Sequence, residues 1–115
     1  MPSHFRKEAH MKTDAVATLT MKKNLCAGRE IDEKEYMCRV LKYDAKHEKL
    51  YLVLENAFLP ELSLDAIYEC NMRQEESVIM CTGRIRERYQ NDHGKILKLE
   101  IKNGFYKINV KSVDK

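Results

Sequence analysis

Three closely spaced arginines are the residues best suited to chemistry in this sequence. Arg84, Arg86 and Arg88 alternate within a stretch rich in β-forming residues. In an extended strand, side chains two residues apart point to the same face, about 7 Å from one another. Guanidinium groups at that spacing hold phosphate oxygens through paired hydrogen bonds. The spacing therefore predicts an anion-binding stripe, and the alternative is an ordinary solvated strand face.

The distribution of charge also points to an anionic partner. The chain carries a net charge of +3, and residues 76–111 contribute eight basic and four acidic side chains, a local charge of +4. Six tyrosines lie within or beside the expected strands. Aromatic rings among basic residues are typical of surfaces that bind single-stranded nucleic acid, although tyrosines in a small barrel also serve as wall and core residues. A nucleic-acid-binding barrel is therefore an alternative function.

Residues that would support catalysis are sparse and scattered. The four histidines lie at positions 4, 10, 47 and 93, and the four glycines lie at 28, 83, 94 and 104. No nucleophile–base pair, phosphate-binding glycine loop or metal-ligand motif emerges from these spacings. We therefore expect a protein that is not an enzyme and has no cofactor.

The four cysteines indicate a reducing compartment. Cys26, Cys38, Cys70 and Cys81 form no Cys-x-x-Cys pair, and two of them, Cys38 and Cys81, lie in apolar runs typical of buried free thiols. No signal-like segment opens the sequence, and no apolar run reaches the roughly 20 residues that cross a bilayer. These features predict a cytoplasmic protein without a membrane span, and the alternative is a secreted domain with two disulfides.

Periodicity predicts six or seven strands and no long helix. Residues 1–13 are polar and aperiodic, so we expect a flexible tail followed by one domain over residues 14–115. Strands are expected at residues 15–21, 36–43, 50–54, 64–70, 78–89, 96–101 and 106–110. Residues 36–43 also fit a helical period, but the polar connection to residues 50–54 favours a hairpin. Turns are expected at residues 91–94 and at Asn103-Gly104, and Gly83 indicates a bulge or a close backbone approach. An all-β antiparallel barrel or a small sandwich follows, and the barrel is favoured because closing the sheet removes exposed edges.

Several of these segments resemble a known family. The sequence Tyr-Met-Cys-Arg-Val at residues 36–40, the apolar run at 50–54, residues 64–70 and the long stretch that ends in Arg-Ile-Arg-Glu-Arg-Tyr are similar to the split β-barrels of the PilZ superfamily. The similarity is greatest to the N-terminal barrel of flagellar-brake-type PilZ proteins and covers residues 36–110, about two thirds of the chain. It implies a bacterial signalling module.

The resemblance also implies a ligand, cyclic di-GMP, which PilZ proteins bind through an Arg-x-x-x-Arg motif and a later Asp/Asn-x-Ser-x-x-Gly motif. Arg84 and Arg88 have the first spacing, but they lie inside the barrel sequence rather than before it. The second motif is missing, because residues 91–94 contain no serine. The expected function is therefore a regulatory module that senses a phosphate-bearing ligand such as a cyclic dinucleotide or acts through a protein partner. A homodimeric scaffold is a further alternative.

Overall fold

Six strands and one short 3-10 turn make up the computed structural model, which describes residues 14–26, 28–74 and 77–109. The elements are β1 (Val16–Asn24), β2 (Tyr36–Asp44), β3 (Lys49–Leu54), η1 (Leu59–Glu61), β4 (Ala66–Gln74), β5 (Ser77–Asn91) and β6 (Gly94–Asn109). The expected tail at residues 1–13 lies outside the described residues. In the part of the chain that the structure describes, no helix is long and apolar enough to cross a membrane.

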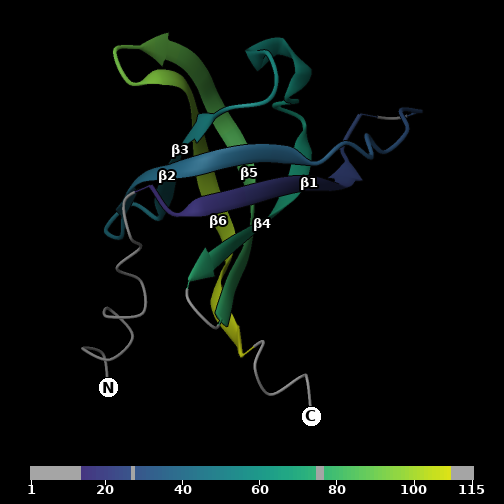
Figure 1. Cartoon of the computed structure of the whole chain (residues 1–115). Helices are drawn as coiled ribbons and strands as arrows, with labels where there is room; N and C mark the ends of the chain where they lie inside the picture. The colour runs from purple at the N-terminus through teal and green to yellow at the C-terminus, as the bar shows by residue number, and fades with distance from the viewer. Residues whose placement is uncertain (1–13, 27, 75–76, 110–115) are drawn as a thin grey trace.

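The strands form a closed barrel in the order β1-β2-β3-β6-β5-β4, and every neighbouring pair is antiparallel. Two meanders of three strands build the ring, and the connection of residues 55–65 joins them. In Figure 1, β1 and β2 run across the view while β5 and β6 cross behind them. The prediction of an all-β fold with antiparallel strands is confirmed, with six strands.

The predicted turn at Asn103-Gly104 is wrong, because β6 passes through it without a break. Pairing with β5 continues on both sides of this dipeptide, from Ile101 opposite Gly83 to Tyr106 opposite Met80. Between these two pairs β6 contains more residues than β5, and register shifts around Thr82 accommodate the difference. The Thr82 hydroxyl accepts a hydrogen bond from the Asn103 side chain at 3.0 Å. A favoured turn dipeptide is therefore absorbed into a bulged ladder. The other predicted turn, at residues 91–94, does connect β5 to β6, and Gly94 has a φ of +122°.

Gly83 lies at a close backbone approach, as its position in a strand predicts. A Cβ at this position would lie 2.4 Å from the carbonyl oxygen of Glu100 and 3.0 Å from Cγ of Leu99. Only a residue without a side chain allows β5 and β6 to pair this closely.

The barrel interior is filled by alternate side chains from every strand. Fully buried members include Leu19, Leu52, Leu97 and Leu99, with Tyr68 among the largest. Cys38, Cys70 and Cys81 are also buried, which confirms the prediction for Cys38 and Cys81, and all three are free thiols. The core is therefore continuous through the barrel.

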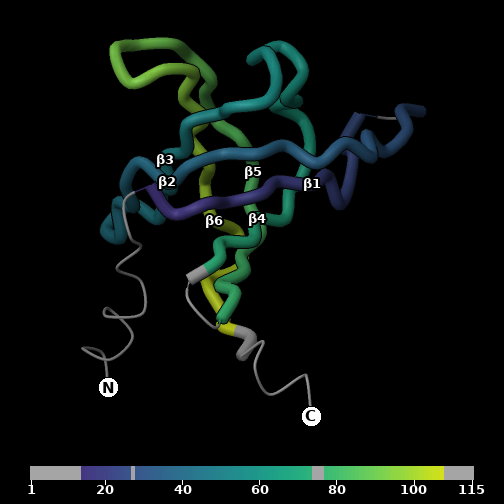
Figure 2. The backbone as a smooth tube through the Cα atoms, viewed as in Figure 1, coloured from purple at the N-terminus to yellow at the C-terminus, as the bar shows by residue number. Residues whose placement is uncertain are grey.

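The two ends of the barrel differ. At one end, the rings of Tyr43 and Phe105 pack edge to face, 4.9 Å between centroids. At the other end lies the connection of residues 55–65, which we call the strap, and its Leu62 is completely buried in the core. Figure 2 shows the strap in teal and the β5–β6 hairpin in light green rising on the same side of the molecule. The candidate site lies at this end.

Candidate functional site

The strap is held to the barrel by cationic side chains that donate to its backbone carbonyls. Lys95 Nζ donates to the carbonyl of Ala57 at 2.6 Å, and Arg84 Nε donates to the carbonyl of Leu64 at 2.9 Å. Arg88 donates through Nη1 to the carbonyl of Leu62. The backbone N–H of Ser63 donates to the hydroxyl of the buried Tyr68 at 2.9 Å. These contacts fix a segment that contains no strand of its own.

The three arginines do not form one stripe, because a bulge in β5 separates them. Ile85 lies opposite Leu99 and Glu87 lies opposite Lys98, so Arg86 is an extra residue in the ladder. An extra residue reverses the alternation of faces beyond it. Arg84 therefore lies on the outer face, opposite Glu100, while Arg88 is opposite the buried Leu97 and turns toward the end of the barrel.

Each arginine also has a different partner. Arg84 Nη2 lies 3.2 Å from a carboxylate oxygen of Asp65, in addition to its bond to the strap. Arg86 Nε lies 3.5 Å from a carboxylate oxygen of Glu100. Arg88 has a carbonyl as its partner and no carboxylate within ion-pair distance among the described residues. Of the three, Arg88 keeps a formal positive charge that no carboxylate neutralises.

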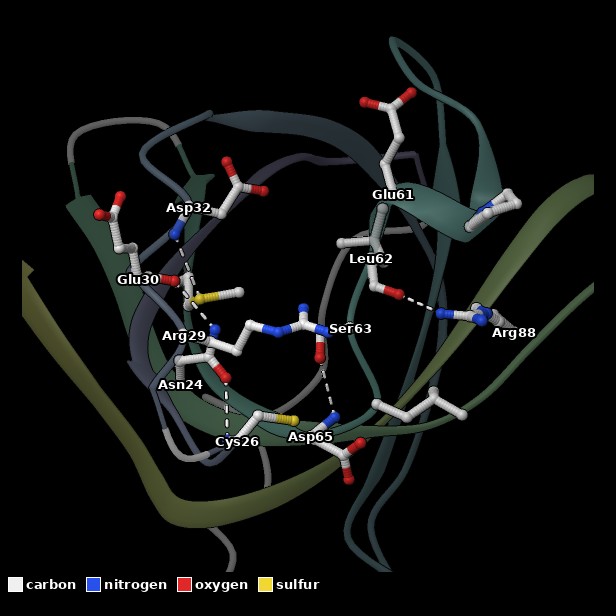
Figure 3. A pocket seen from close by; sticks show the side chains of 13 residues that line it. Asn24, Cys26, Arg29, Glu30, Asp32, Glu61, Leu62, Ser63, Asp65 and Arg88 are labelled. Atoms are coloured by element: carbon white, nitrogen blue, oxygen red, sulfur yellow. Dashed lines mark hydrogen bonds between the residues drawn. The ribbon is translucent and has the colours of Figure 1, made fainter.

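A cleft of about 490 Å³ opens beside the strap, in the volume range typical of small-molecule sites. It is lined by residues of β1 and the loop after it (Met21, Asn24, Cys26, Arg29, Glu30 and Asp32), residues of the strap (Pro60, Glu61, Leu62, Ser63, Leu64 and Asp65), and Arg88. Figure 3 shows Arg29 projecting from the loop toward the strap, with Arg88 against Leu62 at the other side of the view. The lining thus combines four carboxylates, two guanidinium groups and apolar side chains.

The loop that carries Arg29 is tied down by its own contacts. The Asn24 side chain accepts a hydrogen bond from the Cys26 N–H at 3.0 Å and donates to the carbonyl of Glu30 at 2.9 Å. The backbone N–H of Asp32 points at the sulfur of Met21, 3.4 Å away. Gly28 has a φ of +78°, a conformation that glycine adopts without strain. The loop therefore presents Arg29 from a defined backbone.

Two of the cleft's four carboxylates are neutralised by cations outside the cleft. Glu61 accepts a hydrogen bond from Lys34 Nζ at 2.9 Å, and Asp65 is paired with Arg84. The backbone N–H of Phe58 and the Lys34 ammonium both favour the ionised form of Glu61 and lower its pKa. These two acids have structural partners.

Asp32 is bound by a hydroxyl rather than by a cation. The Tyr36 hydroxyl donates to Asp32 at 2.5 Å, a short hydrogen bond. Burial raises the pKa of Tyr36, and the hydrogen bond to the carboxylate raises it further, so the phenol stays protonated. Asp32 therefore lies at the wall of the cleft with a hydroxyl partner, and no cation among the described residues is paired with it.

Two charged side chains of the loop have no partner among the described residues. No hydrogen bond or ion pair joins the guanidinium of Arg29 or the carboxylate of Glu30 to another part of the chain that the structure describes. Together with Arg88 and Asp32, they give the cleft two cations and two anions that no oppositely charged side chain neutralises. Such a lining has hydrogen-bond donors and acceptors available to a ligand.

The sequence singled out Arg88 but gave no signal for the rest of the cleft. Arg29 stands alone in a polar loop, and nothing in its spacing relates it to Arg88, 59 positions away. The pair becomes visible only when the strap and the loop after β1 meet at one end of the barrel. Among the described residues, no three histidines, cysteines or acids lie close enough together to hold a metal ion.

Comparison with known proteins returns no match for this chain. No protein-family model matches it, no curated protein matches its sequence, and no solved structure matches its fold.

Proposed function

We propose that this chain is a non-enzymatic regulatory module, similar to a PilZ barrel of the bacterial cytoplasm, that binds a phosphate-bearing ligand such as a cyclic dinucleotide. The ligand occupies the cleft beside the strap. The PilZ relationship rests on the resemblance of sequence segments and on a six-stranded antiparallel barrel. The ligand rests on the residues that line the cleft.

One observation carries the proposal: Arg29 and Arg88 both line the cleft, and no carboxylate among the described residues neutralises either one. A guanidinium has five N–H donors, and Arg88 uses one of them for the carbonyl of Leu62. The remaining donors of the two side chains are available to the oxygens of a phosphate, which guanidinium groups bind in pairs.

The acidic side chains of the cleft fit the remainder of such a ligand. Glu30 and Asp32 are hydrogen-bond acceptors, and the hydroxyl groups of a ribose and the N–H groups of a base are donors. A lining that mixes hydrogen-bond donors and acceptors suits a nucleotide, which carries both. Inorganic phosphate at neutral pH carries almost only acceptors, so it would offer Glu30 and Asp32 almost no donors.

The role of Arg84 and Arg86 differs from the one that their spacing predicts. Arg84 is engaged by the strap and by Asp65, and Arg86 lies beside Glu100. We assign ligand binding to Arg88 with Arg29, and we assign a structural role to Arg84.

Titration calorimetry with cyclic di-GMP, cyclic di-AMP and GMP tests the proposal. Arg29→Ala and Arg88→Ala should each weaken binding at least about tenfold, because a hydrogen bond to a charged group contributes roughly 1.5–3 kcal/mol. Arg86→Ala is the matched control, since Arg86 lies on the same strand and does not line the cleft. If none of the three nucleotides binds below millimolar concentration, the sensing function is wrong.

A second candidate function, single-stranded nucleic-acid binding, is favoured by one feature of the outer face. The Tyr51 ring lies between two lysines, with Lys42 Nζ 4.7 Å and Lys98 Nζ 6.0 Å from its centroid. An aromatic ring flanked by cations is the arrangement on which bases stack while phosphates pair with lysines. A gel shift with an oligonucleotide that weakens steeply with salt and is lost in Tyr51→Ala would favour this function.

A further inference from the structure

Two buried thiols face each other between β4 and β5, away from the cleft. Cys70 and Cys81 are directly opposed in the antiparallel ladder of these two strands, which run side by side in Figure 1. Both side chains are 0% exposed, and a hydrogen bond joins the two thiols inside the barrel. Neither residue lines the cleft, so the proposed function leaves this pair without a role.

The position of the pair meets the geometric requirement for a disulfide. Residues directly opposite each other in an antiparallel ladder have Cα atoms about 4.5 or about 5.5 Å apart, and disulfides span Cα separations of about 4.4–6.8 Å. The hydrogen bond between the thiols already places the two sulfur atoms next to each other. A disulfide removes two hydrogen atoms and adds none, so the packed core has room for the product.

The third buried thiol, Cys38, lacks an opposed partner of this kind. It lies on β2, where the residues directly opposite it are Ala17 of β1 and Leu54 of β3. In the ring of strands β1 lies between β2 and β4, so the backbones of Cys38 and Cys70 are two strand spacings apart. Cys38 therefore shares the burial of the pair without its geometry, and it provides an internal comparison.

An irregularity in the sheet lies directly beside Cys81. The register of β5 with β6 shifts between Met80 and Thr82, so Cys81 has no directly opposed residue on β6. A bulge disrupts the ladder locally, and such segments open at a lower free energy than a continuous ladder does. Hydrogen peroxide is little larger than water and needs only a small opening. A disulfide reagent would leave a bulky group for which the core has no room.

We propose that Cys70 and Cys81 are a modification site, at which hydrogen peroxide converts the two thiols into a disulfide that joins β4 to β5. In the first step the thiolate of one cysteine attacks an oxygen of the peroxide, the O–O bond breaks, hydroxide leaves, and the sulfur becomes a sulfenic acid. In the second step the thiol of the other cysteine attacks that sulfur, the S–S bond forms, and the S–O bond breaks to release water. Two thiols and one peroxide give one disulfide and two water molecules, and two electrons pass from sulfur to oxygen.

The reaction should be slow, and its product should stabilise the barrel. The hydrogen bond with Cys81 and burial raise the pKa of Cys70 well above its ordinary value, and the thiolate is the reactive form. The pair therefore responds to sustained exposure to peroxide rather than to a brief pulse. Once formed, the disulfide closes a loop over residues 71–80 and restricts the unfolded chain, which favours the folded state.

Peptide mapping of the native full chain after long incubation with hydrogen peroxide tests the proposal. Trypsin cleaves after Arg73, which lies between the two cysteines, so only a disulfide keeps the peptides of Cys70 and Cys81 together. The remaining thiols are alkylated in denaturant before digestion of the monomeric fraction. The joined peptides should be at least about tenfold more abundant than any other cysteine pair, because opposed thiols react at a high effective concentration.

Cys38→Ala is the matched control, because it removes a buried thiol that no cysteine opposes. It should form the same disulfide as wild type. Cys70→Ala, shown to be folded by circular dichroism, should leave Cys81 as a thiol or sulfenic acid without a link to Cys38. Oxidised wild type should unfold at a higher urea concentration than the reduced protein, and a reductant should reverse this shift.

Three results overturn the proposal. The first is a native chain in which Cys70 and Cys81 stay reduced while the half-exposed Cys26 is oxidised. The second is a disulfide from Cys38 that is as abundant as the one between Cys70 and Cys81. The third is an oxidised barrel that unfolds at a lower urea concentration than the reduced one. None of these measurements involves a nucleotide, so failure here is distinguishable from failure of the proposed function.

Discussion

The guanidinium of Arg88 donates a hydrogen bond to the carbonyl oxygen of Leu62, and the side chain of Leu62 is completely buried at the end of the barrel. Arg88, which the sequence predicts to be exposed and to face a ligand, therefore also holds the strap at the end of the core. Arg88 reaches the strap because the bulge at Arg86 turns it from the outer face of β5 toward the barrel end. The same side chain lines the cleft, so Arg88 both fastens the strap and faces the cleft.

Removing an arginine that holds the strap should cost stability. Arg84→Ala and Arg88→Ala each leave a strap carbonyl without its donor, and we expect each to lower the free energy of unfolding by about 1–2 kcal/mol, the value for a charged hydrogen bond reduced for partial exposure. Arg86→Ala, which removes an exposed contact with Glu100, should change it by less than about 0.5 kcal/mol. Urea denaturation measures all three. Equal stabilities would mean that the strap does not depend on these bonds.

The strands could be predicted from the sequence because one face of each is buried. Residues 97–102 alternate between apolar and charged side chains, and the structure buries Leu97, Leu99 and Ile101 while leaving Lys98 and Lys102 on the outside. What alternation could not provide is the position of the bulges. A single extra residue at Arg86 reverses the faces beyond it, and no residue type marks the reversal.

The prediction of a turn at Asn103-Gly104 was wrong for a related reason. Local preference favours a turn at this dipeptide, but continuous pairing with β5 forms hydrogen bonds along both sides of it.

The cleft could not be predicted because its walls come from segments far apart in the sequence, the loop with Arg29 and the strap with Leu62. Polar loop residues have no periodicity from which a common surface can be derived.

Gly83 on β5 and Gly104 on β6 should respond differently to alanine. Gly83→Ala places a Cβ 2.4 Å from the carbonyl oxygen of Glu100, a backbone atom that cannot rotate away. The strands must separate locally, and we expect a loss of about 1–3 kcal/mol or more, as for other overpacked sites.

Gly104→Ala is the matched control for Gly83→Ala. Its Cβ would meet no atom of the described residues within 4 Å, and the position has no positive φ. This variant should be neutral or more stable by up to about 1 kcal/mol, because alanine reduces the entropy of the unfolded chain. Thermal unfolding monitored by circular dichroism compares the two. A Gly83→Ala protein as stable as Gly104→Ala would contradict the close approach of β5 and β6.

The cysteines should separate into one accessible and three protected thiols. Burial raises the pKa of Cys38 to about 12, and the nearby Glu55 carboxylate adds to the effect. A hydrogen bond with Cys81, together with burial, raises the pKa of Cys70 well above its ordinary value. At pH 8 the thiol of Cys38 is therefore protonated, and the thiolate is the reactive form.

Cys26 is the half-exposed thiol and should react first with a disulfide reagent. Cys38, Cys70 and Cys81 should react only on the timescale of unfolding, and all four should react at once in denaturant. Kinetics of thiol labelling, followed by mass spectrometry of the labelled peptides, assign each rate. Rapid labelling of Cys38 or Cys70 in the native protein would show that the barrel opens far more readily than its packing implies.

The strap should also lose stability in acid through Glu61. The hydrogen bond from the Phe58 N–H and the contact with Lys34 lower the pKa of Glu61 from its ordinary value of 4.5. A carboxylate with a lowered pKa in the folded state stabilises that state above the unfolded pKa, and the contribution disappears as pH falls through the folded value. Wild type should therefore be more stable than Glu61→Gln at pH 7, and the difference should shrink as pH drops below 4.5.

The control for Glu61→Gln is Glu33→Gln, on the same side of the barrel. It removes a carboxylate with no hydrogen bond or ion pair to any described residue. Urea denaturation from pH 7 to pH 3 gives the three curves, and hydrogen exchange at residues 57–65 shows whether the loss is confined to the strap. A constant difference between wild type and Glu61→Gln over this range would mean that the charge of Glu61 does not contribute to holding Phe58 and the strap in place.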